Sequence, residues 1–401
     1  LTRGLVICQI ALTAALLVAA TLQIKSVRNI SQLDYGYDEN AVYSARIALM
    51  EGTYPTEDVR REFFQRAVSA LRTNSQFESA ALTNRFRMTF APNGSYEADG
   101  QNYLTERDRP RCNFESVSDN YFATLGLKIL EGRDFTVNDV DSRQPVAIVN
   151  ASFARKHWGS QSPLGHQVRI FNPSHEQPWR TIVGVVPDTL MQSPFDQQTD
   201  GAGFYMPLLG ASSVAQFCTI IVRPHLGQRA DDLNPVLSRA VADLDSNLPI
   251  YFAETPAQFH HEILSGNRLI TRLFTIFGAV GFILSAVGLY SVMSFSVNQR
   301  TQEFGIRMAL GADTARIFRM VMGQGAWQLA LGLILGAGGI ALLFGVVAAA
   351  SLKDLLFKVN ALDPTIYFTV AILLTLVAAA ACFFPARRAT RVDPMTALRY
   401  E

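Results

Sequence analysis

The residues best suited to chemistry at an interface form a short segment of mixed charged and apolar character, Glu303-Phe-Gly-Ile-Arg-Met-Ala-Leu-Gly-Ala312. Glu303 and Arg307 lie four residues apart with the acid first, which is the stabilising orientation of an ion pair on a helix face. Gly311 stands where such a helix would end, and Asp313 can cap the helix that follows. The pattern predicts a rigid helical elbow that a protein partner can grip.

Four stretches of the chain contain no Asp, Glu, Lys or Arg, and two of them enclose the predicted elbow. They cover residues 5–24, 273–297, 326–350 and 366–384. A helix needs roughly 20 apolar residues to cross a bilayer, so we expect four transmembrane helices. The first stretch is longer than the apolar core of a signal peptide and no small-residue cleavage site precedes Lys25, which favours an anchor.

Basic residues gather on one side of these stretches. The segments 298–325 and 385–401 each hold four arginines against two acidic residues. The long segment 25–272 has more acidic than basic residues, and 351–365 is balanced. Because cytoplasmic loops are enriched in Lys and Arg, we expect the elbow and both termini to be cytoplasmic and the long segment to lie outside.

An internal repeat organises the long outer segment. A strand, a helix and a strand are predicted at 42–49, 56–74 and 77–83, and again at 217–223, 231–247 and 249–253. The two helical stretches end alike, Arg66–Asn74 and Arg239–Asn247. The second carries an apolar stripe at helical spacing, formed by Leu233, Val236, Leu237, Ala240, Val241 and Leu244. Two β-α-β copies that flank an insertion are therefore expected.

The expected fold class is an α+β membrane protein with four transmembrane helices and a large extracytoplasmic domain. Its two β-α-β units form a membrane-proximal subdomain, and a β-rich subdomain is inserted between them. The expected boundaries are 1–26 for the first transmembrane helix, 27–90 and 213–262 for the β-α-β units, 91–212 for the insertion and 263–401 for the remaining helices.

Other residues that could carry chemistry are poorly arranged for it. His260 and His261 precede Glu262, but adjacent histidines point to different sides of a helix and no third ligand is evident nearby, so we expect no metal site. We find no nucleophile elbow and no basic patch with interleaved aromatic residues, which argues against an enzyme and against nucleic-acid binding. We therefore expect no catalytic residues and no cofactor.

The apolar stretches themselves suggest rigid helices rather than a conducting pathway. They contain no charged residue of the kind that usually marks an ion or proton path. The glycines of 332–339 have no accompanying lysine, so close helix packing is favoured over a phosphate loop. Cys8 and Cys382 lie within apolar stretches. A disulfide between Cys112 and Cys218 is left open, since both lie on the expected oxidising side.

Several motifs together resemble one family. The chain is similar to permeases of the MacB/FtsX class of ATP-binding-cassette (ABC) systems, in which the elbow looks like the coupling helix. The outer segments that carry the likeness are Tyr121–Gly126, Glu131–Phe135, Phe153–Trp158, Pro163–Gly165 and Ile182–Val186. The tail Pro385–Glu401 resembles the family's C-terminal signature. The likeness implies that the β-α-β units form a porter subdomain and the insertion a sabre subdomain.

The resemblance also implies which residues meet a partner. The coupling-helix positions are Glu303, Phe304, Gly305, Ile306, Arg307, Met308, Leu310 and Gly311, and the tail positions are Arg387, Arg388, Asp393 and Pro394. MacB carries its ATPase on the same polypeptide, whereas this sequence contains no Gly-x-x-x-x-Gly-Lys-Ser/Thr motif. We therefore expect a non-catalytic permease that works with a cytoplasmic ABC ATPase subunit in trans.

The start at Leu1 resembles the second module of the duplicated permeases common in acidobacteria. Either a second module of that kind or a second protomer is expected as a partner, along with membrane lipid, and a periplasmic adaptor is left open. The implied location is the bacterial inner membrane. The implied function is export by mechanotransmission from the ATPase to the periplasmic domain. The alternative is an FtsX-like signalling scaffold that regulates an extracytoplasmic partner such as a cell-wall hydrolase.

Overall fold

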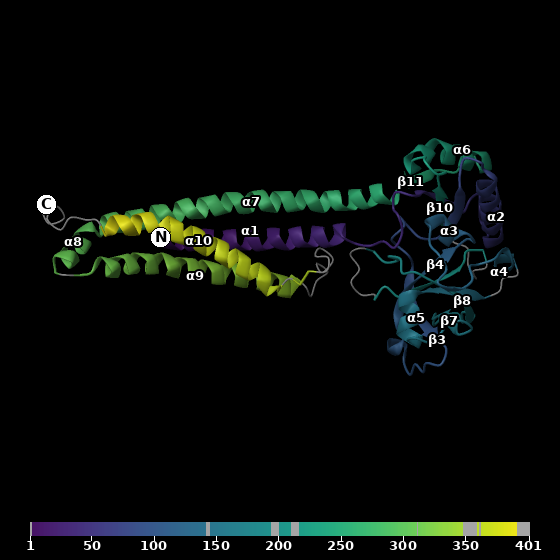
Figure 1. Cartoon of the computed structure of the whole chain (residues 1–401), viewed down its shortest axis with the longest axis horizontal. Coiled ribbons are helices and arrows are strands. Elements are labelled where there is room, and N and C mark those ends of the chain that lie inside the picture. Colours follow the sequence, from purple (N-terminus) through teal and green to yellow (C-terminus); the bar gives the residue numbers. More distant parts are fainter. Residues whose placement is uncertain are drawn as a thin grey trace. The chain divides into compact units, whose positions relative to one another are not determined.

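The computed structural model describes residues 2–141, 145–193, 200–209, 216–310, 312–347, 359–360 and 362–390. It divides into two compact units (Figure 1). The first, the helical unit, comprises Leu1–Ser31 with Leu264–Glu401, and the second, the sheet unit, comprises Gln32–Ile263.

The helical unit contains the four predicted apolar helices. Their bounds are α1 (Thr2–Ser31), α7 (Pro256–Gln299, whose first residues belong to the sheet unit), α9 (Thr314–Val347) and α10 (Pro364–Ala389). A fifth, short helix, α8 (Thr301–Ala309), separates α7 from α9. Each of the four long helices has the length and hydropathy needed to cross a membrane, which confirms that part of the prediction.

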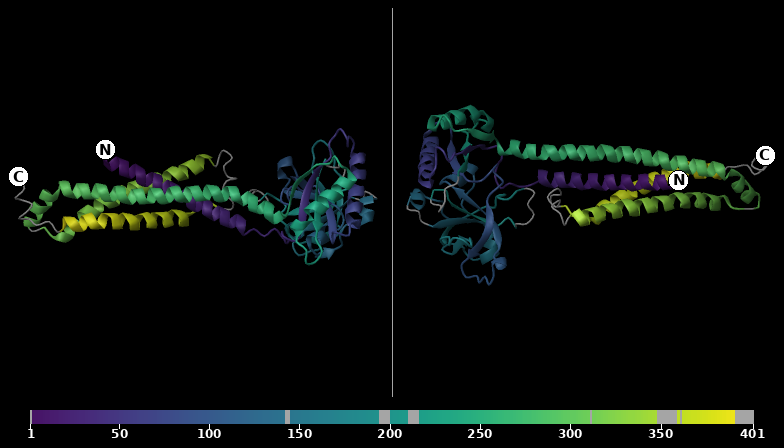
Figure 2. Two further views of the ribbon diagram at one scale, coloured as in Figure 1. Left: turned by 90° about the horizontal axis from the view of Figure 1, so that it is seen from above. Right: turned by 180° about the vertical axis from the view of Figure 1, so that it is seen from behind.

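Small residues allow the long helices to pack closely, as expected for membrane helices. A Cβ atom added at Gly332 would lie 2.5 Å from Ile10, and one added at Gly336 would lie 2.9 Å from the Cβ of Ala14 on α1. Gly332 and Gly336 are therefore packing residues, as predicted, whereas a Cβ atom added at Gly338 or Gly339 would have no neighbour within 4 Å. Between α7 and α1, the hydroxyls of Thr13 and Ser285 share a 2.9 Å hydrogen bond. Figure 2 shows α1, α9 and α10 lying against one another.

The described residues of the sheet unit form eleven strands. They are β1 (Tyr43–Ala48), β2 (Ser79–Thr83), β3 (Asn93–Ala98), β4 (Arg111–Val117), β5 (Glu131–Gly132), β6 (Val146–Asn150), β7 (Gln167–Ile170), β8 (Arg180–Val186), β9 (Gly203–Pro207), β10 (Phe217–Arg223) and β11 (Ile250–Glu254). The order is β11-β1-β10-β2-β4-β3-β7-β8-β6-β9, with β5 on β8.

Two β-α-β units interleave at one end of this sheet. The first is β1, α2 (Glu57–Thr73) and β2, and the second is β10, α6 (Asn234–Leu244) and β11. Each strand pair is separated by a strand of the other unit, since β10 lies between β1 and β2 while β1 lies between β10 and β11. The predicted repeat is confirmed at the level of these elements.

The two repeat helices cover one face of these four strands. Thr56 caps α2 through its side chain, and Phe63 and Phe64 bury its inner face. The predicted stripe of the second helix packs into the same core through Leu237 and Val241. The helix predicted at 231–247 is shorter than expected, because its start forms a separate 3₁₀ turn (Ala230–Leu233) and proline occupies the first turn of α6.

The insertion is rich in strands, as predicted, and it closes on itself. Strands β4, β3, β7, β8, β6 and β9 each pair with the next, and β9 returns to pair with β4 in parallel. The described part of the insertion also contains a 3₁₀ turn (Glu106–Asp108) and the helices α3 (Tyr121–Leu125), α4 (Val137–Asp141) and α5 (Ala151–Trp158). Closure pairs the backbone groups of β4 and β9, which as edge strands would be exposed to aggregation.

The two parts of the sheet unit share one hydrogen-bonded path. Strands β2 and β4 meet through Thr83 and Val117. Residues 32–263 form a single compact unit, so the boundary between the two expected subdomains stays a prediction. Cys112 and Cys218 are buried free thiols in different hydrophobic clusters, which resolves the open disulfide question against a bridge in this structure.

Candidate functional site: the helical elbow

The predicted elbow is a distinct helix between two long ones. Only Arg300 separates the end of α7 from the start of α8, and the chain then turns into α9 (Figure 1). The Asp313 side chain accepts a 3.2 Å hydrogen bond from the backbone N–H of Ala315 and so caps α9, which begins at Thr314 as predicted. Gly311 lies outside the described residues.

The charged pair of the elbow forms as the spacing predicted. Nη2 of Arg307 lies 2.5 Å from Oε1 of Glu303, and Nε of Arg300 lies 3.9 Å from the other carboxylate oxygen. Both partners of the closer pair are more than 40% exposed. An exposed pair of this kind contributes only about 0–1 kcal/mol to stability. The main effect of the ion pair is to hold one positive and one negative group at fixed positions on the surface of α8.

The inner face of α8 is anchored by apolar packing. Phe304 and Gly305 are buried, and Met308 packs against the same cluster. That cluster includes residues from both neighbouring helices, Val297 of α7 and Ile317 of α9. Nη1 of Arg307 also lies 3.2 Å from the sulfur of Met320 on α9. These contacts join α8 to the helices on either side of it.

The outer face of α8 presents apolar residues beside the charged pair. Ile306 is 43% exposed and Leu310 is 82% exposed. Exposed apolar residues beside a fixed charge pair suit a protein contact. The structure describes all the predicted coupling residues except Gly311. Phe304, Gly305 and Met308 lie on the inner face of α8. Glu303, Ile306, Arg307 and Leu310 are accessible at its surface.

The tail is only partly described. Arg387 and Arg388 lie exposed in the last turn of α10, where positive charge complements the helix dipole. Asp393 and Pro394 lie outside the described residues, so the predicted cap between them stays a prediction.

His260, one of the two adjacent histidines considered as metal ligands, contacts a carboxylate and an aromatic ring. Nδ1 of His260 lies 2.6 Å from a carboxylate oxygen of Glu39, and its ring stacks on Tyr35 with centroids 3.7 Å apart. No group of three or more His, Cys, Asp or Glu side chains suited to a metal occurs among the described residues. Sequence reasoning missed this contact, because Glu39 is more than 200 residues away in the chain.

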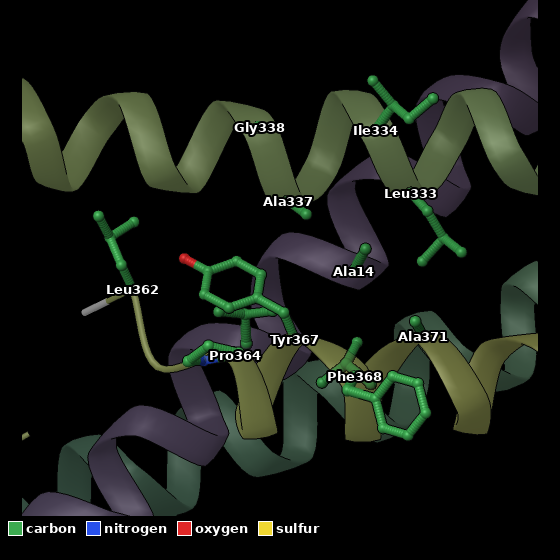
Figure 3. Close-up of a pocket in the computed structure, with 12 residues that line it drawn as sticks. Ala14, Leu333, Ile334, Ala337, Gly338, Leu362, Pro364, Tyr367, Phe368 and Ala371 are labelled. Carbon is green, nitrogen blue, oxygen red and sulfur yellow. The ribbon is translucent and has the colours of Figure 1, made fainter. Parts of the chain in front are cut away.

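A second feature missed from the sequence is an apolar groove in the helical unit. It lies between α9 and α10 with α1 as its floor, and its volume is about 630 Å³ (Figure 3). Next to it, Lys25 of α1 forms an ion pair with Asp363, the residue that caps α10. The only available sequence signals were the Asp363-Pro364 start of a helix and the charge at the end of the first apolar stretch.

Two protein-family models match most of the chain. Residues 3–239 match the MacB-like periplasmic core domain, and residues 275–394 match the FtsX-like permease C-terminal domain. The chain belongs to the MacB-like permease family. The elbow lies wholly within the FtsX-like match, and the two β-α-β units lie largely within the periplasmic core match.

Curated relatives of this MacB-like permease are larger proteins. The macrolide export ATP-binding/permease protein MacB of Chromobacterium violaceum is 24% identical over 294 residues, which cover 71% of this chain and 43% of that protein. The pyoverdine export ATP-binding/permease protein PvdT of Pseudomonas aeruginosa is 29% identical, with 68% and 40% covered. The chain thus spans under half the length of the curated relatives it matches.

Two solved structures are among those to which the chain is similar. The crystal structure of the periplasmic region of MacB from Actinobacillus actinomycetemcomitans is 16% identical and covers 56% of this chain and 94% of that chain, with a TM-score of 0.36. The extracellular domain of the noncanonic ABC-type transporter YknZ from Gram-positive bacteria is 14% identical, with a TM-score of 0.33.

Proposed function

We propose that this MacB-like permease works in an ABC-type export system by passing force from a cytoplasmic ATPase, bound at α8, to its extracytoplasmic unit. The observation that carries the proposal is the two-sided character of α8. Phe304 on its inner face is buried in a cluster that includes residues of both neighbouring helices, while Glu303, Arg307 and Leu310 remain exposed for a partner. A helix held and exposed in this way cannot be pushed without moving its neighbours.

The length and position of α7 support the same proposal. This helix has 44 residues and so extends for about 66 Å. It begins at Pro256 in the sheet unit and ends at Gln299, one residue before α8. In the proposed cycle, closure of a pair of ATPase subunits displaces α8 and shifts α7, and the β-α-β units, acting as a porter, tilt with it. Cargo already on the outer side is then released outward.

The proposal includes a membrane orientation for the elbow and a second permease module or protomer as a partner. By the positive-inside rule, the arginines of the elbow and of the end of α10 support a cytoplasmic location for both. A second permease module or protomer is needed because ABC ATPases act as pairs. The cargo class is left to experiment, since the relatives named for macrolide and pyoverdine export share no more than 29% identity with this chain.

The proposal is tested by crosslinking and ATPase assay with the full chain. A photo-crosslinking amino acid at Leu310 is expected to capture an ABC ATPase subunit when the chain is purified from its native host. Arg307→Glu is expected to lower capture and stimulated ATP hydrolysis by about tenfold or more, equivalent to ~1.4 kcal/mol of lost interaction. Arg229→Glu makes the same change of charge in the sheet unit, where Arg229 is highly exposed, and serves as the matched control.

Two outcomes would count against the proposal. Absence of any ATPase at Leu310 would remove the coupling role of α8. Equal effects of Arg307→Glu and Arg229→Glu would mean that the change in total charge, rather than the elbow, was responsible. Recovery of a cell-wall hydrolase with the outer unit, with no cargo that stimulates ATP hydrolysis, would instead support the regulatory alternative.

A further inference from the structure

The groove in the helical unit has an apolar lining contributed by three helices. Ala14 and Val18 of α1 form its floor, Leu333 and Ala337 of α9 form one wall, and Tyr367 and Ala371 of α10 form part of the other. Figure 3 shows Tyr367 extending from α10 toward α9, with its hydroxyl the one polar side-chain group among the labelled residues.

The groove exists because α9 and α10 are held together at one end and apart at the other. At one end they meet closely, since a Cβ atom added at Gly325 of α9 would overlap the sulfur of Cys382 on α10. Further along, Gly332 and Gly336 hold α9 against α1. The start of α10 is instead tied to α1 by the ion pair between Lys25 and Asp363.

Several residues that line the groove are too small to fill the space between α9 and α10. Ala337, Gly338 and Ala371 line it where longer apolar side chains would have closed the space. The groove is open on one side, and its apolar lining, with a volume of about 630 Å³, forfeits van der Waals contacts unless another apolar group lies against it. Water gains little there, because it needs polar partners and this lining offers almost none.

We propose that the groove binds one acyl chain of a membrane phospholipid. Hydrocarbon chains are the surrounding solvent of helices that span a bilayer. The groove volume falls within the range of about 300–1,000 Å³ typical of small-molecule sites. An apolar chain gains contacts with three helices there, whereas at the outer surface of a single helix it would touch only one.

Charges beside the groove match a phospholipid headgroup. Asp363 stands between Leu362 and Pro364, which both line the groove. The side chain of Lys25 is 43% exposed, so its ammonium can pair with a phosphate while it stays beside Asp363. The carboxylate of Asp363 can in turn attract the cationic part of a zwitterionic headgroup. The Tyr367 hydroxyl adds a polar group of the kind often found near the membrane interface.

A bound acyl chain would set the angle between α9 and α10. Because Ile317, near the other end of α9, belongs to the same buried cluster as Phe304 of α8, the lipid would influence the position of the elbow. The binding claim itself rests only on the helices spanning a membrane and does not require that α8 bind an ATPase.

Photolabelling of the full chain in phosphatidylcholine nanodiscs tests the site. The probe is phosphatidylcholine with a diazirine on its acyl chain, and labelled peptides are identified by mass spectrometry. We expect labelling at Tyr367 and Leu333 to exceed that at Ile372 and Leu376, exposed residues of α10 outside the groove lining, by about tenfold, a difference of ~1.4 kcal/mol in occupancy.

Variants that fill the groove provide the control. Ala337→Phe and Ala371→Phe are expected to reduce labelling of Tyr367 by about tenfold. Ala380→Phe adds the same volume at an exposed position on α10 outside the lining and is expected to leave labelling unchanged. Ala371→Leu, a smaller change, replaces Ala371→Phe if circular dichroism shows that the larger side chain prevents folding.

Two results would overturn the proposal. Equal labelling of groove and surface residues would show ordinary annular lipid only. Labelling of Tyr367 that persists in both filled variants would show that the lipid contacts α10 from another side. Crosslinks from these positions to a second copy of the chain in place of lipid would identify a protein contact and would also count against it.

Discussion

The guanidinium of Arg85 lies 3.7 Å from the carboxylate of Glu115, and both side chains are fully buried. Glu115 also accepts a 2.6 Å hydrogen bond from the hydroxyl of Thr83 on β2, so the ion pair lies where β2 meets β4. Burial opposes the charged form of Arg85, yet the Glu115 carboxylate keeps the pKa of Arg85 above its ordinary value. The junction between the two parts of the sheet unit therefore contains a pair of charges that depend on each other.

Removal of one charge from this pair is expected to destabilise the sheet unit strongly. Glu115→Gln should leave the Arg85 charge buried without its partner and lower the free energy of unfolding by about 3–5 kcal/mol. Urea unfolding followed through the fluorescence of Trp158 and Trp179 measures the loss. Arg155→Gln, which removes an exposed pair with Asp188, should cost no more than about 1 kcal/mol. Equal losses in the two variants would contradict the expectation.

The close contact between α9 and α1 predicts intolerance of side chains at Gly336. A Cβ atom there would overlap the carbonyl oxygen of Ala11 and lie 2.9 Å from the Cβ of Ala14. We expect Gly336→Ala to destabilise the helical unit by roughly 1–3 kcal/mol through overpacking. Gly323→Ala is the matched control, since nothing lies within 4 Å of the added atom. Thermal unfolding in detergent compares them, and a Gly336→Ala protein as stable as Gly323→Ala would argue against close packing.

An ion pair in the insertion predicts acid sensitivity. Arg133 donates two hydrogen bonds, of 2.5 and 2.9 Å, to the buried carboxylate of Asp139 and, with further hydrogen bonds from Thr136, lowers its pKa from 3.8 to about 2. Because the folded pKa lies below the unfolded one, the stabilisation is present above about pH 4 and is lost as the pH falls toward about 2. Its size should be about 2 kcal/mol.

The Asp139→Asn protein should lack this component of the acid dependence. Unfolding free energies of the wild-type protein and the variant, measured between pH 6 and pH 2, should differ most at pH 6 and converge at the acid end. A constant difference across the range would show that Asp139 acts through packing rather than through its charge.

The anchor of the elbow predicts a different effect from that of its exposed residues. Phe304 is 2% exposed and belongs to a buried cluster with residues of α7 and α9, so Phe304→Ala should lower the stability of the helical unit by about 3–5 kcal/mol. Leu310→Ala removes a side chain that is 82% exposed and should change stability by less than about 0.5 kcal/mol. If α8 is the coupling helix, Leu310→Ala lowers ATPase capture while its melting temperature stays the same.

Local patterns in the sequence determined the elements of this protein. The charge-free stretches predicted four apolar helices, and the spacing of Glu303, Arg307 and Asp313 predicted the elbow with its ion pair and cap. The two β-α-β units followed from alternating strands and one helical stripe. These features were readable because hydrophobic periodicity, capping and helix-face pairs act over a few residues.

Only the tertiary structure decided which distant residues meet. The return of β9 to β4, the contacts of Glu115 with Arg85 and Glu39 with His260, and the link between Lys25 and Asp363 join segments that no local pattern relates. The groove depends further on where α9 and α10 separate. That point is set by the close contact at Gly325 at one end and by the ion pair between Lys25 and Asp363 at the other. Such features arise from long-range packing, because each requires several helices or strands to be placed before the contact exists.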